Sequence, residues 1–364
     1  MTHSGRTPAW TWAVPVFGLL FFLAATATGY DDNFAAHPLG IVTTIILVPL
    51  LIGVVFAAVY HAEDLAHILG EPLGTLVLTV AVTVIELALI VSLMLTGKAT
   101  PTLVRETVFA VIMIVTTGLV GLCIVVGGIR YREQRFDVTS VKIYVAVLIV
   151  LTTITLILPN YTTSAPGSLY SESQLMFVSI MTIALYGVFL YTQTVLHRGY
   201  FVGEQTAKGA TPSQAKLALA AVLLCVALAA VVLLAKLAAV VIDVGVSQFE
   251  APGSITGVII AIIVLMPESI AAVRAAQKDD LQKSINLALG SGLATIGLTI
   301  PAIAAANLFI HKPFILGLET GDIVLVVMTF ATAILTFATG RTNVLFGFLH
   351  LVIFGTFLFL AFVP

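Results

Sequence analysis

The chain has 364 residues, of which 60% are apolar and only 9% are charged, whereas a soluble domain usually carries roughly a quarter charged residues. Its mean hydropathy is +1.13, and its formal net charge of −2 offers no basic surface for nucleic acid. This composition excludes a soluble globular protein, a secreted disulfide scaffold and a disordered chain. It predicts an all-α polytopic membrane protein in which Cys123 and Cys225 are small apolar residues within apolar runs.

Apolar runs follow one another along the whole chain, and only short polar links separate them. A helix of about 20 apolar residues crosses the hydrocarbon layer of a bilayer. The sequence therefore predicts about 11 transmembrane helices and no soluble domain. The runs lie near residues 10–29, 38–60, 73–96, 104–128, 140–159, 173–195, 216–242, 254–275, 285–310, 321–338 and 341–362.

Lys and Arg orient these helices, because short cytoplasmic loops hold most of the basic residues. With the N-terminus inside, twelve basic residues lie in inside segments and three in outside segments. We therefore expect an integral protein of the bacterial cytoplasmic (inner) membrane, with the N-terminus inside and the C-terminus outside. Residues 1–29 also resemble a cleavable signal, since Ala24-Ala25-Thr26-Ala27 follows an apolar stretch. Cleavage there would leave the other helices in the same orientation.

Two segments of the chain resemble each other. The first segment begins with Glu71-Pro72-Leu73-Gly74-Thr75 and continues as an apolar helix in which Glu86 is the single acid. The second begins with Glu250-Ala251-Pro252-Gly253-Ser254 and continues as an apolar helix in which Glu268 is the single acid. A Gly-rich apolar helix follows each. The first acidic helix is the third span and the second is the eighth, so they cross in opposite directions. Similar segments in opposite orientation indicate an inverted repeat, which is typical of secondary transporters.

The repeat predicts two five-helix halves after an N-terminal helix. The joint between them is rich in Gly and contains Pro212. The predicted parts are an N-terminal segment with the first helix (1–37), the first repeat (38–195), a cytoplasmic linker (196–215) and the second repeat (216–364).

Glu86 and Glu268 are the main candidates for a functional site. A carboxylate near the middle of a membrane costs at least about 2.5–3.5 kcal/mol. A protonated glutamate that bonds a neighbouring helix is the structural alternative for each residue alone. Thr79 and Thr83 precede Glu86 by seven and three residues, so all three share one helical face.

Pro267 makes an oxygen ligand available next to Glu268. Because proline has no N–H, the carbonyl of Ile263, four residues earlier, loses its helical partner. Carboxylates, hydroxyls and carbonyls together form an all-oxygen set, which suits hard cations such as Ca²⁺ better than Zn²⁺ or Cu⁺. The sequence thus predicts Glu86 and Glu268 as a Ca²⁺ site, with no resident cofactor.

Charge balance predicts how such a site would work. Two ionised glutamates neutralise one Ca²⁺, and without it two neighbouring carboxylates in apolar surroundings take up protons. Alternating access of this site would exchange a cation for H⁺. A cation channel is the alternative from another class, and no motif of an intramembrane enzyme is present.

Three stretches of the sequence carry a resemblance to a known family. They are Ala62–Ala66 with Gly70, Gly74 and Glu86; Gly127–Gln134; and Met266–Ile270 with Lys278-Asp279, Gly290-Ser291 and Pro301. In these stretches the sequence resembles the calcium/cation antiporter superfamily and, within it, the bacterial ChaA-type calcium/proton antiporters. This resemblance implies that Glu86 and Glu268 carry Ca²⁺ and H⁺, and it leaves open a sodium/calcium exchanger and transport of Na⁺ or K⁺. Beyond transported ions it implies only membrane lipid as a partner, and it does not set the oligomeric state.

The chain departs from the broader superfamily in its two Gly-rich helices. Relatives carry an amide residue in each, and Thr117 and Ala294 take those places here. Losing both amides removes two carbonyl ligands, which bears on ion selectivity. Ser291 begins a polar repeat with Thr295 and Thr299, which would line a path or join helices.

Acidic residues outside the pair have secondary roles in this interpretation. Glu106 opens the fourth span beside Arg105, either as a carboxylate favourable at a helix N-terminus or as an outer-side relay to Glu86. Glu63, Asp64 and Glu71 lie in an inside loop without Lys or Arg. This loop is either a solvated link or a cytosolic entrance that concentrates cations.

Overall fold

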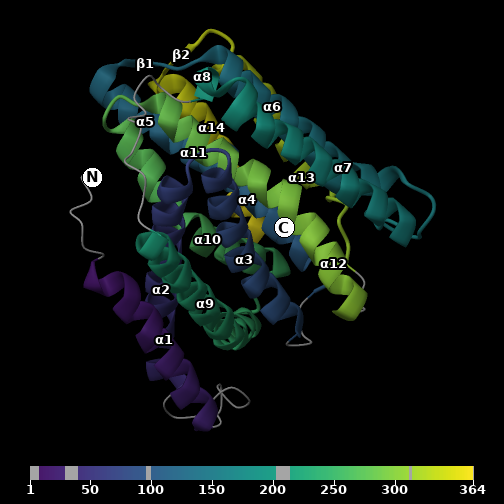
Figure 1. The fold of residues 1–364 in the computed structure, drawn as a ribbon. Coiled ribbons are helices and arrows are strands. Elements are labelled where there is room, and N and C mark those ends of the chain that lie inside the picture. The colour runs from purple at the N-terminus through teal and green to yellow at the C-terminus, as the bar shows by residue number, and fades with distance from the viewer. Residues whose placement is uncertain (1–7, 29–39, 96–99, 202–213, 311–313, 364) are drawn as a thin grey trace. The chain divides into compact units, whose positions relative to one another are not determined.

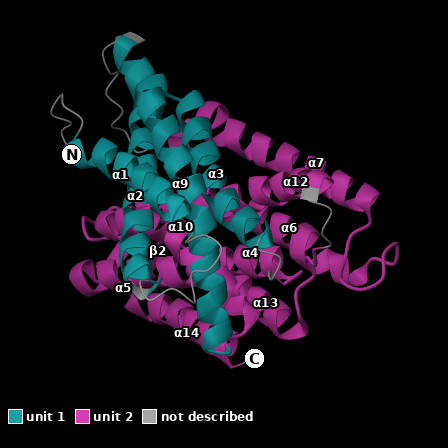
Figure 2. Ribbon diagram, turned by 90° about the horizontal axis from the view of Figure 1, so that it is seen from below, with its two compact units in different colours: residues 1–99, 208–250 teal, residues 100–207, 251–364 magenta. Residues whose placement is uncertain are grey.

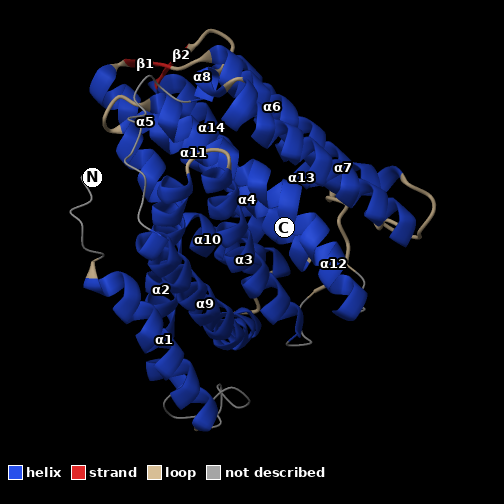
Figure 3. Ribbon diagram, viewed as in Figure 1, coloured by secondary structure: helices blue, strands red, loops and turns tan. Residues whose placement is uncertain are grey.

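The computed structural model describes residues 8–28, 40–95, 100–201, 214–310 and 314–363. Within these ranges the chain is almost wholly helical, with two short strands (Figure 3). Ten helices there are long and apolar enough to cross a membrane, and the shorter apolar helix Thr320–Thr336 corresponds to an eleventh expected span. The predicted all-α membrane architecture is therefore confirmed.

The elements follow the chain in the order labelled in Figure 1. The α-helices are α1 Ala9–Ala27, α2 Gly40–Leu69, α3 Leu73–Leu95, α4 Leu103–Met113, α5 Val120–Tyr131, α6 Val138–Thr152, α7 Glu172–Tyr191, α8 Arg198–Phe201, α9 Gln214–Gln248, α10 Gly253–Ala276, α11 Leu281–Ala294, α12 Ile300–Ile310, α13 Thr320–Thr336 and α14 Val344–Phe362. The π-helices are η2 Ile114–Leu119, η3 Thr153–Ile157, η5 Thr192–Leu196 and η6 Thr295–Thr299, η4 Leu158–Tyr161 is a 3-10 helix, and the strands are β1 Glu133–Arg135 and β2 Arg341–Asn343.

The chain divides into two compact units, coloured separately in Figure 2. Unit 1 consists of residues 1–99 and 208–250, which include α1, α2, α3 and α9. Unit 2 consists of residues 100–207 and 251–364 and holds the remaining elements. Each unit takes helices from both predicted halves, so the expected repeat boundaries stay a prediction. Residues 202–213 of the expected linker lie outside the described residues.

In unit 1, α2 is longer than its apolar run. The sequence suggests a span over 38–60 followed by a loop, but the helix continues to Leu69, so the loop is a single turn. Ala62 and Leu65 explain the difference, because both are buried in an apolar cluster with Leu224 of α9. Gly70 follows the last residue of the helix and has a φ of +67°, a conformation that favours glycine.

In unit 2, β1 pairs antiparallel with β2, and Gln134 lies opposite Thr342. Both residues are buried, at 2% and 3% exposed. β1 follows α5 in the first predicted half, and β2 precedes α14 in the second. The short sheet therefore joins segments that are about two hundred residues apart in the sequence, as their register shows.

The Gly-rich helices of the two halves run in opposite directions within unit 2. Tyr131, at the end of α5, donates its hydroxyl hydrogen to the carbonyl of Gln277, just before α11 begins (3.0 Å). At the other end, the Ile315 N–H, after α12, donates to the carbonyl of Pro101, just before α4 (2.8 Å). Each helical segment thus ends where the other begins, so the two Gly-rich segments run antiparallel, as the predicted inverted repeat requires of them.

Candidate functional site

Glu86 lies in the middle part of α3 and is 1% exposed. Its helix has apolar residues on all sides and packs against α2 and α9 of the same unit. The sequence around it explains the burial, since α3 contains no other acid and no base over its 23 residues. The expected buried acid of the third span is therefore present in unit 1.

Thr79 and Thr83 occupy the preceding turns of α3, as their spacing predicts. The hydroxyl of Thr83 donates to the carbonyl of Thr79 (2.9 Å), and the hydroxyl of Thr79 donates to that of Thr75 (2.9 Å). A hydroxyl that donates its hydrogen keeps lone pairs on oxygen. Both threonines can therefore still offer oxygen to a cation on the turns below Glu86.

Glu268 lies on α10 of unit 2 and is partly exposed. Pro267 is buried inside α10, and the helix continues through it from Gly253 to Ala276. The missing N–H at Pro267 leaves the carbonyl of Ile263 without its usual helical donor. A carbonyl oxygen thus lies one turn before the second acid on the same helix.

Both Gly-rich helices contain a π-helical turn, which the sequence analysis missed. In η2, all six residues are buried, including Thr117, whose hydroxyl donates to the carbonyl of Met113. The matching turn is η6, which starts at the buried Thr295, four residues after Ser291 on α11. Turns of this kind break the regular carbonyl pairing and occur often at functional sites. The Thr-Thr-Gly and Thr-Ile-Gly triplets are the only sequence signal at these places.

Glu106 lies in the first turn of α4 and forms an ion pair with Arg105. The guanidinium lies 2.5 Å from Glu106 Oε1 and 3.0 Å from Glu319 Oε1. It also donates to the carbonyl of Gly317 (3.1 Å). Arg105 and Glu106 are only 7% and 9% exposed. Glu106 is thus held by a fixed cation, which agrees with a structural carboxylate at the start of α4, while the alternative of an outer-side relay stays a prediction.

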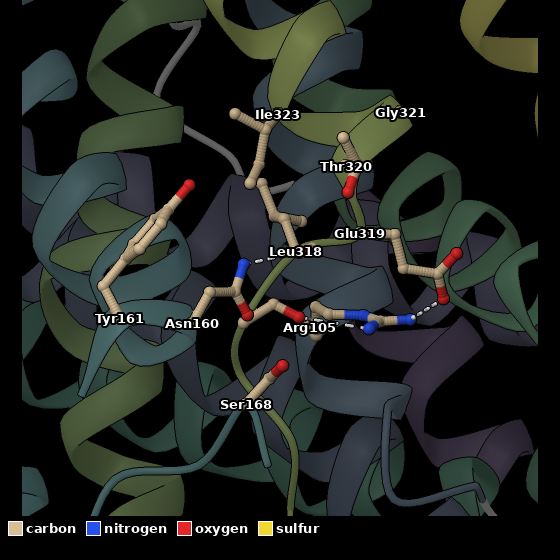
Figure 4. A pocket seen from close by; sticks show the side chains of 10 residues that line it. Arg105, Asn160, Tyr161, Ser168, Leu318, Glu319, Thr320, Gly321 and Ile323 are labelled. Carbon is tan, nitrogen blue, oxygen red and sulfur yellow. Dashed lines mark hydrogen bonds and ion pairs between the residues drawn. The ribbon is translucent and has the colours of Figure 1, made fainter. Parts of the chain in front are cut away.

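A polar cavity of about 580 Å³ lies beside this ion pair in unit 2. Figure 4 shows the Arg105 side chain directed towards Glu319, with Asn160 bonded to the neighbouring loop. Asn160 donates to the carbonyl of Leu318 (2.6 Å), while its Oδ1 is buried without a hydrogen-bond partner. The cavity also reaches the first turn of α13, whose N-cap residue Glu319 makes no capping bond.

The expected entrance acids lie at the end of α2 and in the turn after it. Glu63 is exposed, Asp64 is partly exposed, and the Glu71 carboxylate accepts a hydrogen bond from Thr75 Oγ1 (2.6 Å). His61, by contrast, is fully buried and its Nε2 bonds the carbonyl of Thr11 (3.0 Å). It therefore belongs to the contact between α1 and α2 and not to the acidic surface.

The candidate residues fall into two groups by unit. Glu86, Thr79 and Thr83 share one helix of unit 1, whereas Glu268, Ile263 and Pro267 share one helix of unit 2. Unit 2 also contains Thr117, Ser291 and Glu106, on other helices. Among the described residues, no three side chains of His, Cys, Asp or Glu gather as a metal cluster would require.

Comparisons with known proteins place the whole chain in one family. Residues 39–195 and 219–363 match the family described as sodium/calcium exchanger protein. A Sinorhizobium fredii protein, named as the ionic transporter y4hA, is 41% identical over 100% of this chain and 98% of its own length. The Escherichia coli sodium-potassium/proton antiporter ChaA is 34% identical over 86% of this chain and 87% of its own length.

A solved structure shows the same fold. The crystal structure of the Ca²⁺/H⁺ antiporter protein YfkE superposes with a TM-score of 0.72 at 16% identity. The similarity covers 97% of this chain and 99% of that one. The chain therefore belongs to the sodium/calcium exchanger family, within the calcium/cation antiporter superfamily.

Proposed function

We propose that the protein is a secondary antiporter that exchanges a cation, Ca²⁺ in the first instance, for H⁺ across the membrane. Glu86 and Glu268 bind the cation when both are ionised and bind protons when the cation leaves. One Ca²⁺ or two protons neutralise the pair, whereas both together leave an uncompensated buried charge. Alternating access of the pair to the two sides then couples the two movements.

The observation that carries this proposal is the placing of one acid in each inverted repeat. Glu86 is 1% exposed within a helix long and apolar enough to span a membrane. Glu268 has the matching place on α10, next to the carbonyl of Ile263. The surrounding donors are threonine hydroxyls and main-chain carbonyls, which suit a hard cation. Glu86 is the only acid on α3 and Glu268 is the only acid on α10, and a charged side chain within a membrane has a large free-energy cost.

The distribution of Lys and Arg supports a proposal for the orientation of the protein in its membrane. We infer that the N-terminus faces the cytosol and the C-terminus the outside of a bacterial inner membrane, because twelve basic residues then lie on the inside. In that orientation Glu63, Asp64 and Glu71 lie at the cytosolic end of α2 and α3. Their negative charge would raise the local concentration of cations there.

A second candidate is exchange of Na⁺ or K⁺ for H⁺. The relative from Escherichia coli that covers most of the chain is named a sodium-potassium/proton antiporter, whereas YfkE is named a Ca²⁺/H⁺ antiporter. Thr117 and Ala294 stand where broader relatives have amides. Two fewer amide oxygens lower the coordination number that the site can supply, and a Ca²⁺ ion takes six to eight oxygens.

Everted vesicles that hold an acid interior test the proposal. The dissipation of the pH gradient is followed with a fluorescent dye after addition of Ca²⁺, Na⁺ or K⁺, for the wild type and for Glu86→Gln and Glu268→Gln. We expect Ca²⁺ to release protons in the wild type and each Gln variant to lose this exchange while still being inserted and folded. Glu250→Gln, which changes an exposed acid just before α10, is the matched control.

The outcomes separate the candidates. Proton release by Na⁺ or K⁺ but not by Ca²⁺ would replace the first candidate with the second. Ca²⁺ uptake that follows an imposed Na⁺ gradient and ignores a pH gradient would indicate a sodium/calcium exchanger. Uptake that needs no counter-ion would indicate a channel. Near wild-type exchange in either Gln variant would remove that glutamate from the mechanism.

A further inference from the structure

Gln134, between α5 and α6, is a buried polar residue to which the proposed mechanism assigns no role. It lies in β1 and is 2% exposed. Its Nε2 donates to Asp279 Oδ1 (3.0 Å) and to the carbonyl of Ala276 (3.3 Å). Both acceptors belong to the turn that ends α10, the helix of Glu268. One side chain of the first repeat thus holds the end of a key helix of the second.

The turn that Gln134 holds has an unfavourable backbone conformation. Asp279 has a φ of +62°, in the left-handed region that non-glycine residues adopt at a cost. Its own N–H donates to the carbonyl of Ala276 (3.2 Å), so this carbonyl accepts one hydrogen bond from Asp279 and one from Gln134. The bond from Gln134 to the Asp279 carboxylate is charge-assisted, which makes it stronger than a neutral one. Gln134 therefore stabilises the conformation in which α10 ends.

Neighbouring side chains extend this connection. Tyr131 donates to the carbonyl of Gln277 (3.0 Å), and the N–H of Asp137 donates to Gln282 Oε1 on α11 (2.6 Å). The segment from Tyr131 to Asp137 thus donates to four acceptors on the end of α10, the turn after it and the start of α11, counting Ala276 and Asp279. We call this segment the clasp.

Gly127 leaves the space in which the Gln134 side chain lies. A Cβ at Gly127 would be 1.7 Å from Gln134 Oε1, so any side chain at position 127 would displace the Gln134 side chain. The same oxygen is buried and has no hydrogen-bond partner. The glutamine thus gives up one hydrogen bond on its oxygen while its nitrogen makes two. A buried oxygen without a hydrogen bond costs free energy. The two hydrogen bonds that the nitrogen donates act against this cost and hold the side chain in this position.

We propose that Gln134 is a positioning residue for transport, which holds the C-terminal end of α10 so that Glu268 is preorganised for the cation. This inference rests on the proposed function of Glu268. Without the clasp, α10 and the turn between α10 and α11 adopt more conformations before the cation binds. Binding of the cation then has to restrict these conformations. Such ordering lowers affinity and leaves the maximal rate largely unchanged.

The test compares the half-saturating cation concentration with the maximal rate of proton-coupled exchange in vesicles that contain the full chain. We expect Gln134→Leu to raise the half-saturating concentration about five- to tenfold, with a change of the maximal rate below about twofold. Gln277→Leu is the matched control, because Gln277 is an exposed glutamine of the same turn whose hydrogen bonds here come from its main-chain N–H and carbonyl, which the substitution keeps. It should behave as the wild type.

A second set of variants checks the contact itself. Gly127→Ala should raise the half-saturating concentration as Gln134→Leu does, because the new methyl group displaces the Gln134 side chain. In a Gln134→Ala background there is no side chain to displace, so adding Gly127→Ala should have no further effect. Gln134→Glu keeps the shape but brings a carboxylate to Asp279. Its deficit relative to the wild type should shrink as the pH falls, since a protonated carboxyl donates one hydrogen bond again.

Three results would overturn the inference. The first is a folded Gln134→Leu variant whose half-saturating cation concentration equals that of the wild type. The second is a Gln134→Leu variant that gives less folded protein but has an unchanged cation affinity. Gly127→Ala that is equally harmful with and without Gln134 would also exclude the proposed contact. If the wild type exchanges no cation for protons, the proposed function fails. In that case, amide hydrogen exchange still tests the contact made by Gln134. The amides of residues 277–283 must exchange more slowly in the wild type than in Gln134→Leu.

Discussion

Gly257 on α10 lies against the main chain of Glu106 on α4, so closely that a Cβ at Gly257 would be 2.6 Å from the Glu106 carbonyl carbon. This contact lies on the same helix as Glu268, about three turns earlier. Any side chain there pushes α10 away from α4. The close approach of the two helices therefore depends on a single missing methyl group.

Gly257→Ala should lower the thermal stability of the protein. Overpacking a tight contact costs about 1–3 kcal/mol, and the opposing atoms here are main-chain atoms that cannot move aside. We expect a lower unfolding midpoint in detergent, measured by the fluorescence of a thiol- or tryptophan-based probe. Gly187→Ala on α7 is the control, because no atom lies within 4 Å of its new Cβ. Equal midpoints for the two variants would contradict the contact.

Arg105→Leu should destabilise unit 2 more than Glu106→Gln does. Removing the guanidinium leaves the carboxylate of Glu106 buried at 9% exposure without its cation, and breaking a buried pair costs about 3–5 kcal/mol. The amount of folded protein and its unfolding midpoint measure the effect. The double variant Arg105→Leu/Glu106→Leu should recover much of the loss, because no buried charge remains. A double variant no better than Arg105→Leu would show that the ion pair is not the cause.

Pro267→Ala should weaken cation binding more than it weakens folding. The restored N–H bonds the carbonyl of Ile263, which withdraws an oxygen from the site. We expect the half-saturating cation concentration to rise by roughly tenfold, the effect of about 1.4 kcal/mol, while the unfolding midpoint holds or rises. Pro15→Ala, at the proline inside α1, is the matched control and should leave the half-saturating concentration unchanged. An unchanged cation affinity in Pro267→Ala would show that the carbonyl is not a ligand.

Apparent Ca²⁺ affinity should rise with pH and then level off. In the proposed mechanism, protons bound to Glu86 and Glu268 at low pH must leave before Ca²⁺ binds, so raising the pH should free the site until both acids are ionised. The half-saturating Ca²⁺ concentration is measured between about pH 6 and 9, a range in which histidine also titrates. The measurement therefore uses a protein with His61→Gln and His67→Gln, so that neither histidine in the last part of α2 contributes. The amide introduced in place of His61 can still donate towards the carbonyl of Thr11. A flat affinity across this range would mean that protons and Ca²⁺ do not share the pair.

Patterns along the chain were enough to determine the membrane class, the order of the helices and the opposite orientation of the two repeats. Apolar runs have a length set by the bilayer, which is why each expected run corresponds to a described helix. Single acids such as Glu86 stand out because a charge in apolar surroundings has a large cost. Such signals are local, so they can be read without knowing which helices touch.

Partners distant in the sequence could be found only in the tertiary structure. Nothing in the sequence pairs Arg105 with Glu319 or Gln134 with Asp279. These side chains meet only after α4 has packed near the start of α13, and β1 near the turn after α10. The continuation of α2 to Leu69 depended likewise on Ala62 and Leu65 being buried against α9. The π-helical turns η2 and η6 arise where packing overrides the regular α-helical pairing, because a local pattern of threonine and glycine suits either form.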